Sequence, residues 1–516
     1  MVDFSNNDKD VFIIKMDMID RGALMSRYSR ALNLDIRDVY KKEFADSPSH
    51  ARDFYKRIFL DYGDESVAEL TTAQLGIQNV SNILSKVIEE PRIGLSYLEK
   101  SSRYVRYNKK TDAGYLFLHG ENTGMNNFID EYNEHCNNLF DFYSKSYPEM
   151  LKIFAEKYPV ESFEFEIGGK NYKYKDIGNI DDKTVEKSYK SSLRSAVLDE
   201  IRSVLPASTL TNIGMSGNGR AFISLIERLK AYGTTESLRY SELLYNELEK
   251  ELPDLIDDSV SEHGRMQIEY NNKRENSWNL NQHLSSDLPD VSLLNYMDEK
   301  TALLQAAWLA GYGNSGDFHS MELGSQQARE LINQLAGIRK NRRHKLGRAF
   351  ESINYLFQIN TNYGAFRELQ RHRFLSIIRR DLTTAYGYDI PENIKSIDSI
   401  KMEYISLMED AKSIYSKISK DSGARIAQYA VPYAYRYPVA FNVNLNELAY
   451  FIELRSNQQV HPDLRRVAIG MYCKVRKVHP LLSELIKFVD TGDYKLGRLP
   501  SEIRKEKKKK SINGTD

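Results

Sequence analysis

The stretch "RELQRHRFLSIIRRDL", residues 367–382, guides the interpretation of the whole sequence. It has five arginines and one histidine among sixteen residues, interleaved with apolar side chains such as Leu369 and Leu375. Consecutive side chains point about 100° apart around a helix, so packing the helix would bring part of Arg371-His372-Arg373 against a buried anion or a buried acidic side chain. Arginine binds phosphate and carboxylate oxygens through a rigid, permanently charged fork. The pattern predicts either an anion-binding face or a salt-bridged surface helix, and composition alone favours the surface helix.

The composition is typical of a soluble globular protein. The chain has 516 residues, of which 41% are hydrophobic and 28% charged, enough for about two or three domains. Its formal net charge of zero argues against nucleic acid as a partner. Cys136 and Cys473 are too few and too far apart for a disulfide scaffold or a cysteine-based metal site. We therefore expect a cytoplasmic protein with no bound metal and no membrane-spanning segment.

Two further short motifs contain groups that suit anions. "SYLEKSSRY", residues 96–104, brings Ser101 and Arg103 into one loop, where a hydroxyl, backbone N–H groups and a guanidinium can surround a phosphate. "GNGR", residues 217–220, has two glycines that would let the backbone approach a ligand closely. Such loops are common, so each motif alone is also compatible with an ordinary surface loop.

The sequence also contains a weak internal repeat. "EIRSVLPASTLTNIGMSGNGRAFISLIERL", from residue 200, can be laid over "AQYAVPYAYRYPVAFNVNLNELAYFIELR", from residue 427, and both segments run into an apolar helical pattern. The alignment pairs Pro206 with Pro432 and Asn218 with Asn444. The repeat predicts a diverged tandem duplication.

The repeat suggests a division of the chain. Residues 1–265 would form the first copy and residues 266–503 the second, with a polar connection around residues 271–290. "FEFEIGGKNYKYK" predicts a β-hairpin insertion in the first copy, near residues 160–176. Residues 504–516, which are lysine-rich, would form a disordered basic tail.

Taken together, these motifs resemble the flavin-dependent thymidylate synthases, the ThyX family. The RHR and serine of the family signature match "RHRFLS", residues 371–376, and its Ser-x-Arg-Tyr matches the end of "SYLEKSSRY". Further family elements are similar to "IRSVLP" with Arg202, to Asn218-Gly219-Arg220 and to Leu454-Arg455. The resemblance implies an α+β fold made of two ThyX-like copies, each helix-rich around a small antiparallel sheet.

The resemblance also implies a reaction: conversion of dUMP to dTMP, with methylenetetrahydrofolate as carbon donor, FAD as cofactor and NADPH as its reductant. Arg455 would be catalytic. FAD binding is implied for Arg371, His372, Arg373, Glu99, Asn218, Arg220 and Asn444. Substrate binding is implied for Glu99, Ser101, Arg103, Arg202, Arg371 and Arg455. Because the family forms tetramers, the duplicated chain would be a homodimer that reproduces a pseudo-tetramer.

The departures from the family pattern are divided between the copies. The first copy has Pro91-Arg92-Ile93 in place of RHR, and the second lacks the Ser-x-Arg loop. The substituted positions are Gln428 for an arginine, Glu368 for a glutamine, and Leu346 and Asp64 for a histidine. Since the losses are complementary, each chain would keep one kind of composite site and bind about one FAD. A catalytically silent homologue that keeps nucleotide or flavin binding is the alternative. Nucleic-acid binding through residues 371–380 and the lysine-rich tail is a more remote one.

Overall fold

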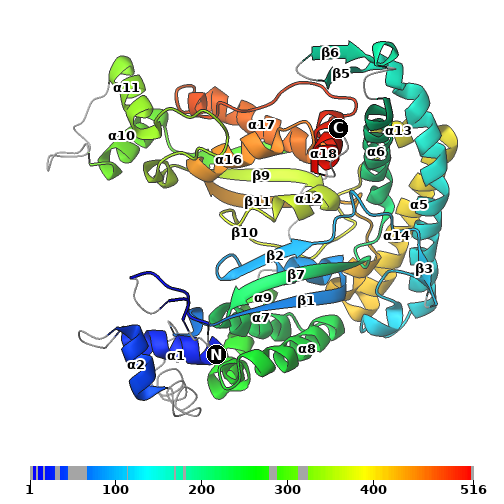
Figure 1. Cartoon of the computed structure of the whole chain (residues 1–516). Helices are drawn as coiled ribbons and strands as arrows, with labels where there is room; N and C mark the ends of the chain where they lie inside the picture. Colours follow the sequence, from blue (N-terminus) through cyan, green and yellow to red (C-terminus); the bar gives the residue numbers. More distant parts are fainter. Residues whose placement is uncertain are drawn as a thin grey trace. The chain divides into compact units, whose positions relative to one another are not determined.

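The computed structural model of the chain (Figure 1) describes residues 4–6, 10–15, 18–29, 35–44, 67–112, 114–167, 170–177, 182–277, 288–311 and 324–512. These residues form two compact units. Unit 1 comprises residues 1–100, 117–129 and 208–282, and unit 2 comprises residues 101–116, 130–207 and 283–516. The first half of the chain therefore contributes to both units.

Unit 1 is built on a three-stranded antiparallel sheet in the order β1-β7-β2. Its strands are β1 (Thr72–Ser81), β2 (Leu95–Glu99) and β7 (Leu210–Asn218). Its helices are α1 (Met18–Tyr28), α2 (Ile36–Glu43), α4 (Asn82–Ile88), α7 (Gly219–Tyr232), α8 (Thr235–Glu251) and α9 (Glu262–Ser277). Ile213 and Met215 of β7 share one hydrophobic core with Phe222 and Leu229 of α7, which follows from a strand of period two and a helix of period 3.6 each burying one face.

Unit 2 is built on a four-stranded antiparallel sheet in the order β10-β11-β9-β8. Its strands are β8 (Val291–Tyr296), β9 (Asn354–Asn362), β10 (Ser376–Ile377) and β11 (Arg436–Asn444). The longer helices are α5 (Ile129–Lys157), α6 (Asp182–Ile201), α10 (Glu299–Leu309), α11 (Ser325–Ala336), α14 (Asp398–Ser422), α16 (Leu445–Arg455), α17 (Pro462–Val478) and α18 (Leu499–Ile512). The shorter ones are α12 (Tyr363–Leu369), α13 (Glu392–Lys395) and α15 (Ala424–Ala427). The fully buried Tyr355, Phe357 and Phe441 give the sheet its aromatic core.

The two sheets share one topology, with β7 and β11 as equivalent central strands. Both strands end at an asparagine that caps the next helix, and the side-chain oxygens of Asn218 and Asn444 each accept a backbone N–H at 2.9 Å. The short strands also correspond, since Ser96 lies opposite Ser216 and Ser376 opposite Asn442. Together with the mixed α+β content, this confirms the predicted fold class.

The glycines of the GNGR stretch are closely packed against neighbouring side chains. A Cβ on Gly217 would lie 2.4 Å from Leu95 Cδ2, and one on Gly219 would lie 2.4 Å from Leu255 Cδ2. Close packing within unit 1 therefore explains both glycines, and a ligand approach at this stretch stays a prediction.

The hairpin region contains a pair of short antiparallel strands. Strand β5 (Glu164–Ile167) pairs antiparallel with β6 (Lys170–Lys173), while the turn at residues 168–169 lies outside the described residues. Strands β3 (Lys110–Thr111) and β4 (Gly114–Tyr115) form a second small hairpin.

The tail is helical up to Ile512 rather than disordered. The reason is that Ile503 is buried, and that Glu506 forms an ion pair with Lys187 of α6 at 2.6 Å and with Lys509 at 3.0 Å. The predicted connection at residues 271–290 begins inside α9, and its residues 278–287 lie outside the described part. The boundary proposed between the copies, at residue 265, stays a prediction about the repeat.

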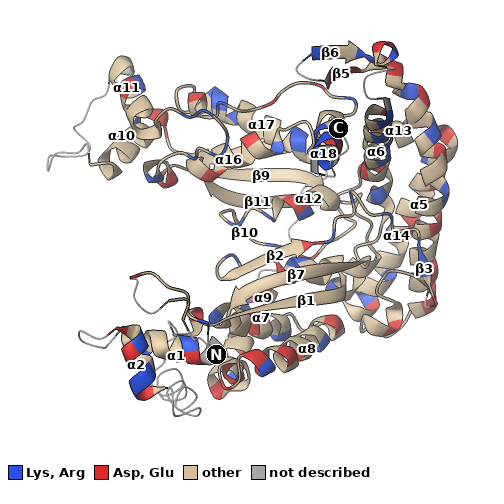
Figure 2. Cartoon of the chain, in the orientation of Figure 1, with Lys and Arg blue, Asp and Glu red and all other residues tan. Residues whose placement is uncertain are grey.

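Charged residues gather on helices and loops. Figure 2 shows the strands of the two sheets almost wholly uncharged; as described, they contain only Glu99 and Arg436 as charged residues. Among the described residues, the helices are all too short or too polar to span a bilayer.

Candidate active site

The loop after β2 places a buried arginine in unit 2. Arg103 is 9% exposed, and its guanidinium donates to both carboxylate oxygens of Asp199 at 2.8 and 2.9 Å. A third donation goes to the carbonyl oxygen of Gln459 at 3.2 Å. Asp199 lies three residues before Arg202 at the end of α6, so this helix supplies both an acceptor and a cation.

Asp199 also pairs with a second arginine. Arg498, which lies just before α18, donates to its carboxylate at 2.9 Å. Burial opposes the charged form, but Arg103 and Arg498 outweigh it and hold the pKa of Asp199 far below its usual range. Asp199 is therefore a permanent anion that fixes both guanidinium groups.

A second carboxylate, Glu368 of α12, lies among three arginines. Arg202 donates to it at 3.3 Å, and the guanidinium nitrogens of Arg103 and Arg455 lie 3.6 and 3.8 Å from its other oxygen. Burial opposes ionisation here too, yet the arginines lower the pKa of Glu368 to about 2. Arg202 additionally donates to the hydroxyl of Ser102 at 3.2 Å.

His372 of the RHR triplet orients the third arginine. Arg455 Nε donates to His372 Nε2 at 2.8 Å, and His372 Nδ1 donates to Glu447 at 2.9 Å. Burial lowers the pKa of His372 despite Glu447, so the ring is neutral, with its proton on Nδ1. Arg455 also donates to the backbone carbonyl of Glu368 at 3.3 Å, which leaves it held from two sides.

Unit 2 thus brings together residues from both halves of the sequence. Of the predicted site residues, the structure places Arg103, Arg202, His372 and Arg455 in one buried network. Ser101 lies at the edge of this network, where its hydroxyl accepts the backbone N–H of Arg103 at 3.3 Å. In the RHR triplet only the histidine is buried; Arg371 is exposed and Arg373 half-buried.

The other predicted residues have local partners. Glu99 accepts from Lys86 at 3.1 Å and from Ser85 at 3.2 Å inside unit 1. Arg220 forms an exposed ion pair with Glu69 at 2.8 Å. The two asparagines cap helices, as described above. The structure therefore does not bring Glu99, Asn218, Arg220 or Asn444 into the arginine network.

Sequence reasoning missed Ser102, Asp199, Glu447 and Arg498. Asp199 could have been found, because it precedes Arg202 by one helical turn and so shares its face. No local signal marks Arg498, since its partner lies 299 positions away. Glu368 was noted only as a departure, although it contacts all three arginines. Of the two predicted flavin-site departures from histidine, Leu346 is buried in unit 2 and Asp64 lies outside the described residues.

A cavity of about 890 Å³ adjoins the network in unit 2. Asp199, Arg202, Arg498 and His461 line one part of it. His461 donates to the backbone carbonyl of Asp199 at 3.1 Å, and burial lowers its pKa. The cavity gives Arg202 and Arg498 a space beside them in which a ligand can lie.

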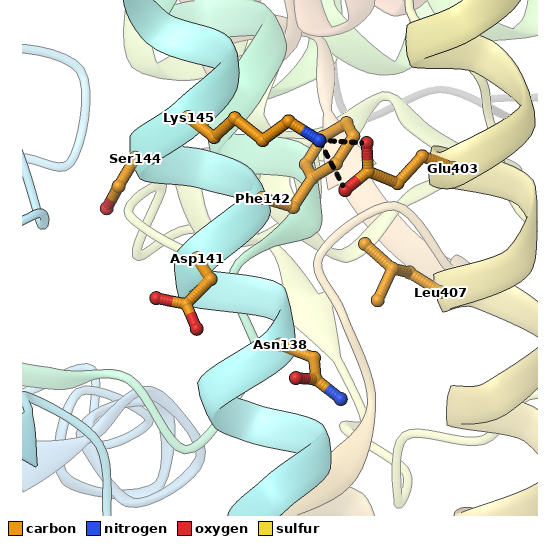
Figure 3. Close-up of a pocket in the computed structure, with 7 residues that line it drawn as sticks. All are labelled: Asn138, Asp141, Phe142, Ser144, Lys145, Glu403 and Leu407. Atoms are coloured by element: carbon orange, nitrogen blue, oxygen red, sulfur yellow. Dashed lines mark hydrogen bonds and ion pairs between the residues drawn. The ribbon is translucent and has the colours of Figure 1, made fainter.

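A second hollow, of about 590 Å³, lies between α5 and α14 (Figure 3). Lys145 donates to both oxygens of Glu403 across it, at 2.9 and 3.3 Å. Both side chains are substantially exposed, and such pairs contribute little stability. Within the described residues, the structure has no cluster of three or more side chains suited to a metal ion.

Comparison with known proteins gives the context of these residues. The family model described as "Thymidylate synthase complementing protein" (Thy1) matches residues 22–254 and 292–481. A "UPF0159 protein" of Thermoplasma acidophilum is 50% identical, with 95% of this chain and 99% of that protein covered. A "UPF0159 protein" of Chlamydia pneumoniae is 33% identical, with 97% and 96% covered.

More distant relatives match one part of the chain. A "Flavin-dependent thymidylate synthase" of Helicobacter pylori is 23% identical over 186 residues, or 32% of this chain and 86% of that protein. Among solved structures, a UMP/dUMP methylase PolB from Streptomyces cacaoi bound with 5-Br dUMP is 21% identical, with a TM-score of 0.30 and 39% of this chain and 94% of that chain covered. The family model matches once in each half of the sequence, as the resemblance predicted, and the chain therefore belongs to the thymidylate synthase complementing protein family.

Proposed function

We propose that the chain is a flavin-dependent thymidylate synthase, which methylates dUMP to dTMP with methylenetetrahydrofolate as the carbon donor. The observation that carries the proposal is the network in unit 2. There, Arg103 and Arg202 from the first half of the sequence meet Arg455 and His372 from the second. These are the positions at which each half keeps the family residue that the other has lost.

Arg103 and Arg202 would hold the 5′-phosphate of dUMP, with the hydroxyl of Ser101 at the edge. Arginine suits this role because its fork matches phosphate oxygens and its charge does not titrate in the physiological range. Asp199 already orients Arg103, and the hydroxyl of Ser102 accepts from Arg202, so less conformational freedom is lost when the phosphate binds.

Arg455 would stabilise negative charge as it develops on the uracil ring, a type of preorganised electrostatic help that is worth several kcal/mol. His372 is a positioning residue in this scheme. Its neutral ring accepts from Arg455 Nε and donates its own N–H to Glu447, which holds the ring in place. Rotation of the guanidinium would therefore break its bond to a fixed acceptor.

The side chains around the RHR triplet also fit FAD. Arg371, which is exposed, and Arg373, which is half-buried, flank the buried His372 along the chain. Phe374, which follows Arg373 and precedes strand β10, is 68% exposed. Two guanidinium groups suit a diphosphate and an exposed aromatic ring suits a planar ring system. When bound, FAD would supply hydride chemistry, with NADPH as the reductant. Flavin roles for Glu99, Asn218, Arg220 and Asn444 stay predictions from the family resemblance.

The test is flavin stoichiometry together with turnover. We expect about one FAD per chain, because Pro91-Arg92-Ile93 lacks the donors that Arg371-His372-Arg373 provides. Absorbance of released flavin against protein concentration measures this ratio, and dUMP-dependent tritium release from labelled C5 measures turnover. Two flavins per chain would contradict the stoichiometry.

The second candidate is a silent homologue that binds nucleotide or flavin without methylation. It is favoured by Glu368, whose carboxylate already neutralises part of the arginine network. Flavin binding without any tritium release would support it.

For either function, we propose that two chains associate as a homodimer, for which light scattering should give twice the chain mass.

A further inference from the structure

The two buried carboxylates of the arginine network are held very differently. Asp199 accepts from Arg103 at 2.8 and 2.9 Å and from Arg498 at 2.9 Å. Glu368 has one hydrogen bond with a guanidinium, at 3.3 Å from Arg202, and its other two arginine nitrogens lie at 3.6 and 3.8 Å. Those two distances exceed the usual hydrogen-bond range. Glu368 is therefore the more loosely bound anion of the two.

The network also keeps an excess of positive charge. Its four guanidinium groups, on Arg103, Arg202, Arg455 and Arg498, face the carboxylates of Asp199 and Glu368, and the neutral His372 links Arg455 to a third carboxylate, Glu447. These side chains therefore carry one positive charge more than negative ones. Burial lowers the pKa of Arg202 and of Arg455, and Glu368 only partly offsets it. Since an incompletely neutralised cation is costly to bury, the network can accept more negative charge.

We propose that Glu368 occupies the place of a ligand phosphate among Arg103, Arg202 and Arg455, and that binding of the phosphate displaces it. The inference rests on the proposed function, because it concerns the same arginines. A phosphate monoester carries about two negative charges and three acceptor oxygens, whereas Glu368 offers one charge and two oxygens. The exchange therefore favours a dianionic phosphate over any monoanion.

This gives Glu368 a role in specificity. A ligand must supply enough charge and enough acceptors to compete with a carboxylate that is attached to the protein. A nucleoside without its phosphate cannot do so, and a simple carboxylic acid merely replaces one carboxylate by another. The glutamine of the family pattern has no charge and would not compete in this way.

The experiment measures binding of inorganic phosphate to the full chain by isothermal titration calorimetry. In Glu368→Gln we expect phosphate to bind about tenfold more tightly than in the wild type, since the internal competitor loses its charge. A purely structural role predicts the opposite, because loss of the carboxylate would then disorder the arginines and weaken binding. Glu403→Gln is the matched control: it removes one charge from the exposed pair in Figure 3 and should leave phosphate affinity unchanged.

Glu368→Asp provides the second variant, and it carries the test if Glu368→Gln does not fold. It keeps the charge but withdraws it by one methylene group from the arginines, so phosphate should bind several-fold more tightly. Unchanged or weaker phosphate binding in the folded variants would overturn the inference.

The experiments can contradict the proposed function and the displacement of Glu368 independently of each other. If phosphate binds more tightly in the variants but the wild type has no dUMP-dependent turnover, the displacement stands and the synthase assignment does not. If the wild type turns over dUMP and phosphate affinity is unchanged in the variants, the assignment stands and the displacement does not.

Discussion

Units 1 and 2 share one strand and helix topology but place opposite kinds of charge beside it. In unit 1, Lys86 of α4 is fully buried and pairs with Glu89 and, at 3.1 Å, with Glu99. In unit 2, Glu368 of the equivalent helix α12 is surrounded by three arginines. One cation between two acids makes a network without surplus positive charge, whereas one acid among three cations leaves room for an anion. The fold tolerates both, so the charge pattern and not the topology decides where a phosphate can bind.

The largest expected effect tests whether the unit 1 network is structural. Lys86→Met leaves Glu89 and Glu99 buried without their cation, and removal of one partner from a buried pair costs about 3–5 kcal/mol. The midpoint of urea unfolding, followed by circular dichroism, measures the loss. Lys250→Met, which breaks the exposed pair with Glu247, is the control and should shift the midpoint little. A Lys86→Met midpoint equal to that of the control would show that the buried network contributes no stability.

The next effect concerns catalysis by unit 2. Arg455→Ala should lower dUMP-dependent turnover about 10²–10³-fold, as expected for loss of a preorganised charge donor. Arg103→Ala, in the other half of the sequence, should be similarly damaging. Arg228→Ala is the matched control, since Arg228 lies in the corresponding helix of unit 1 and pairs with Glu90 and Glu275. Wild-type turnover in Arg455→Ala, or loss of turnover in Arg228→Ala, would break the comparison.

A third prediction concerns the free energy of unfolding at low pH. The arginines lower the folded-state pKa of Glu368 to about 2 from an ordinary value of 4.5. The resulting stabilisation is present above the ordinary value and is lost as pH falls through the folded value; it is on the order of 3 kcal/mol. The difference in unfolding free energy between wild type and Glu368→Gln should therefore shrink from about pH 5 toward pH 3. A difference that is constant with pH would mean that the carboxylate is not held by the arginines.

The smallest expected effect distinguishes the two helix-capping asparagines, Asn218 and Asn444. Asn218→Ala and Asn444→Ala should each cost about 1 kcal/mol of stability. Asn444→Ala should also reduce turnover, because Asn444 fixes the backbone of Glu447, which in turn holds His372. Asn444→Ser keeps a capping oxygen and should restore both properties. Wild-type turnover in Asn444→Ala would contradict a link between this cap and the histidine.

The repeated parts of the fold were accessible from the sequence. The alignment of Asn218 with Asn444 is matched in space, since both end a central strand and begin a helix. These features depend on local patterning, which a sequence displays directly. The complementary losses likewise pointed to a network that joins Arg103 to Arg455.

Tertiary packing accounts for what the sequence did not show. The carboxylate of Glu99 pairs with Lys86, a partner that no motif marks, while its expected ligand role stays a prediction. The division into units also departs from sequence order. Helices α5 and α6 of the first half pack in unit 2, where Glu131 pairs with Lys417 at 2.5 Å and Glu200 accepts from Asn393. Such pairings depend on long-range contacts, which periodicity does not encode.

The bond between Arg103 and Gln459 joins residues 356 positions apart along the chain. Closing so long a loop has an entropic cost that must be met before the contact can stabilise anything, and folds dominated by distant contacts form slowly. The arginine network should accordingly be among the last parts of unit 2 to assemble during refolding. Phosphate affinity would then appear in a late kinetic phase, after most of the helical signal has returned.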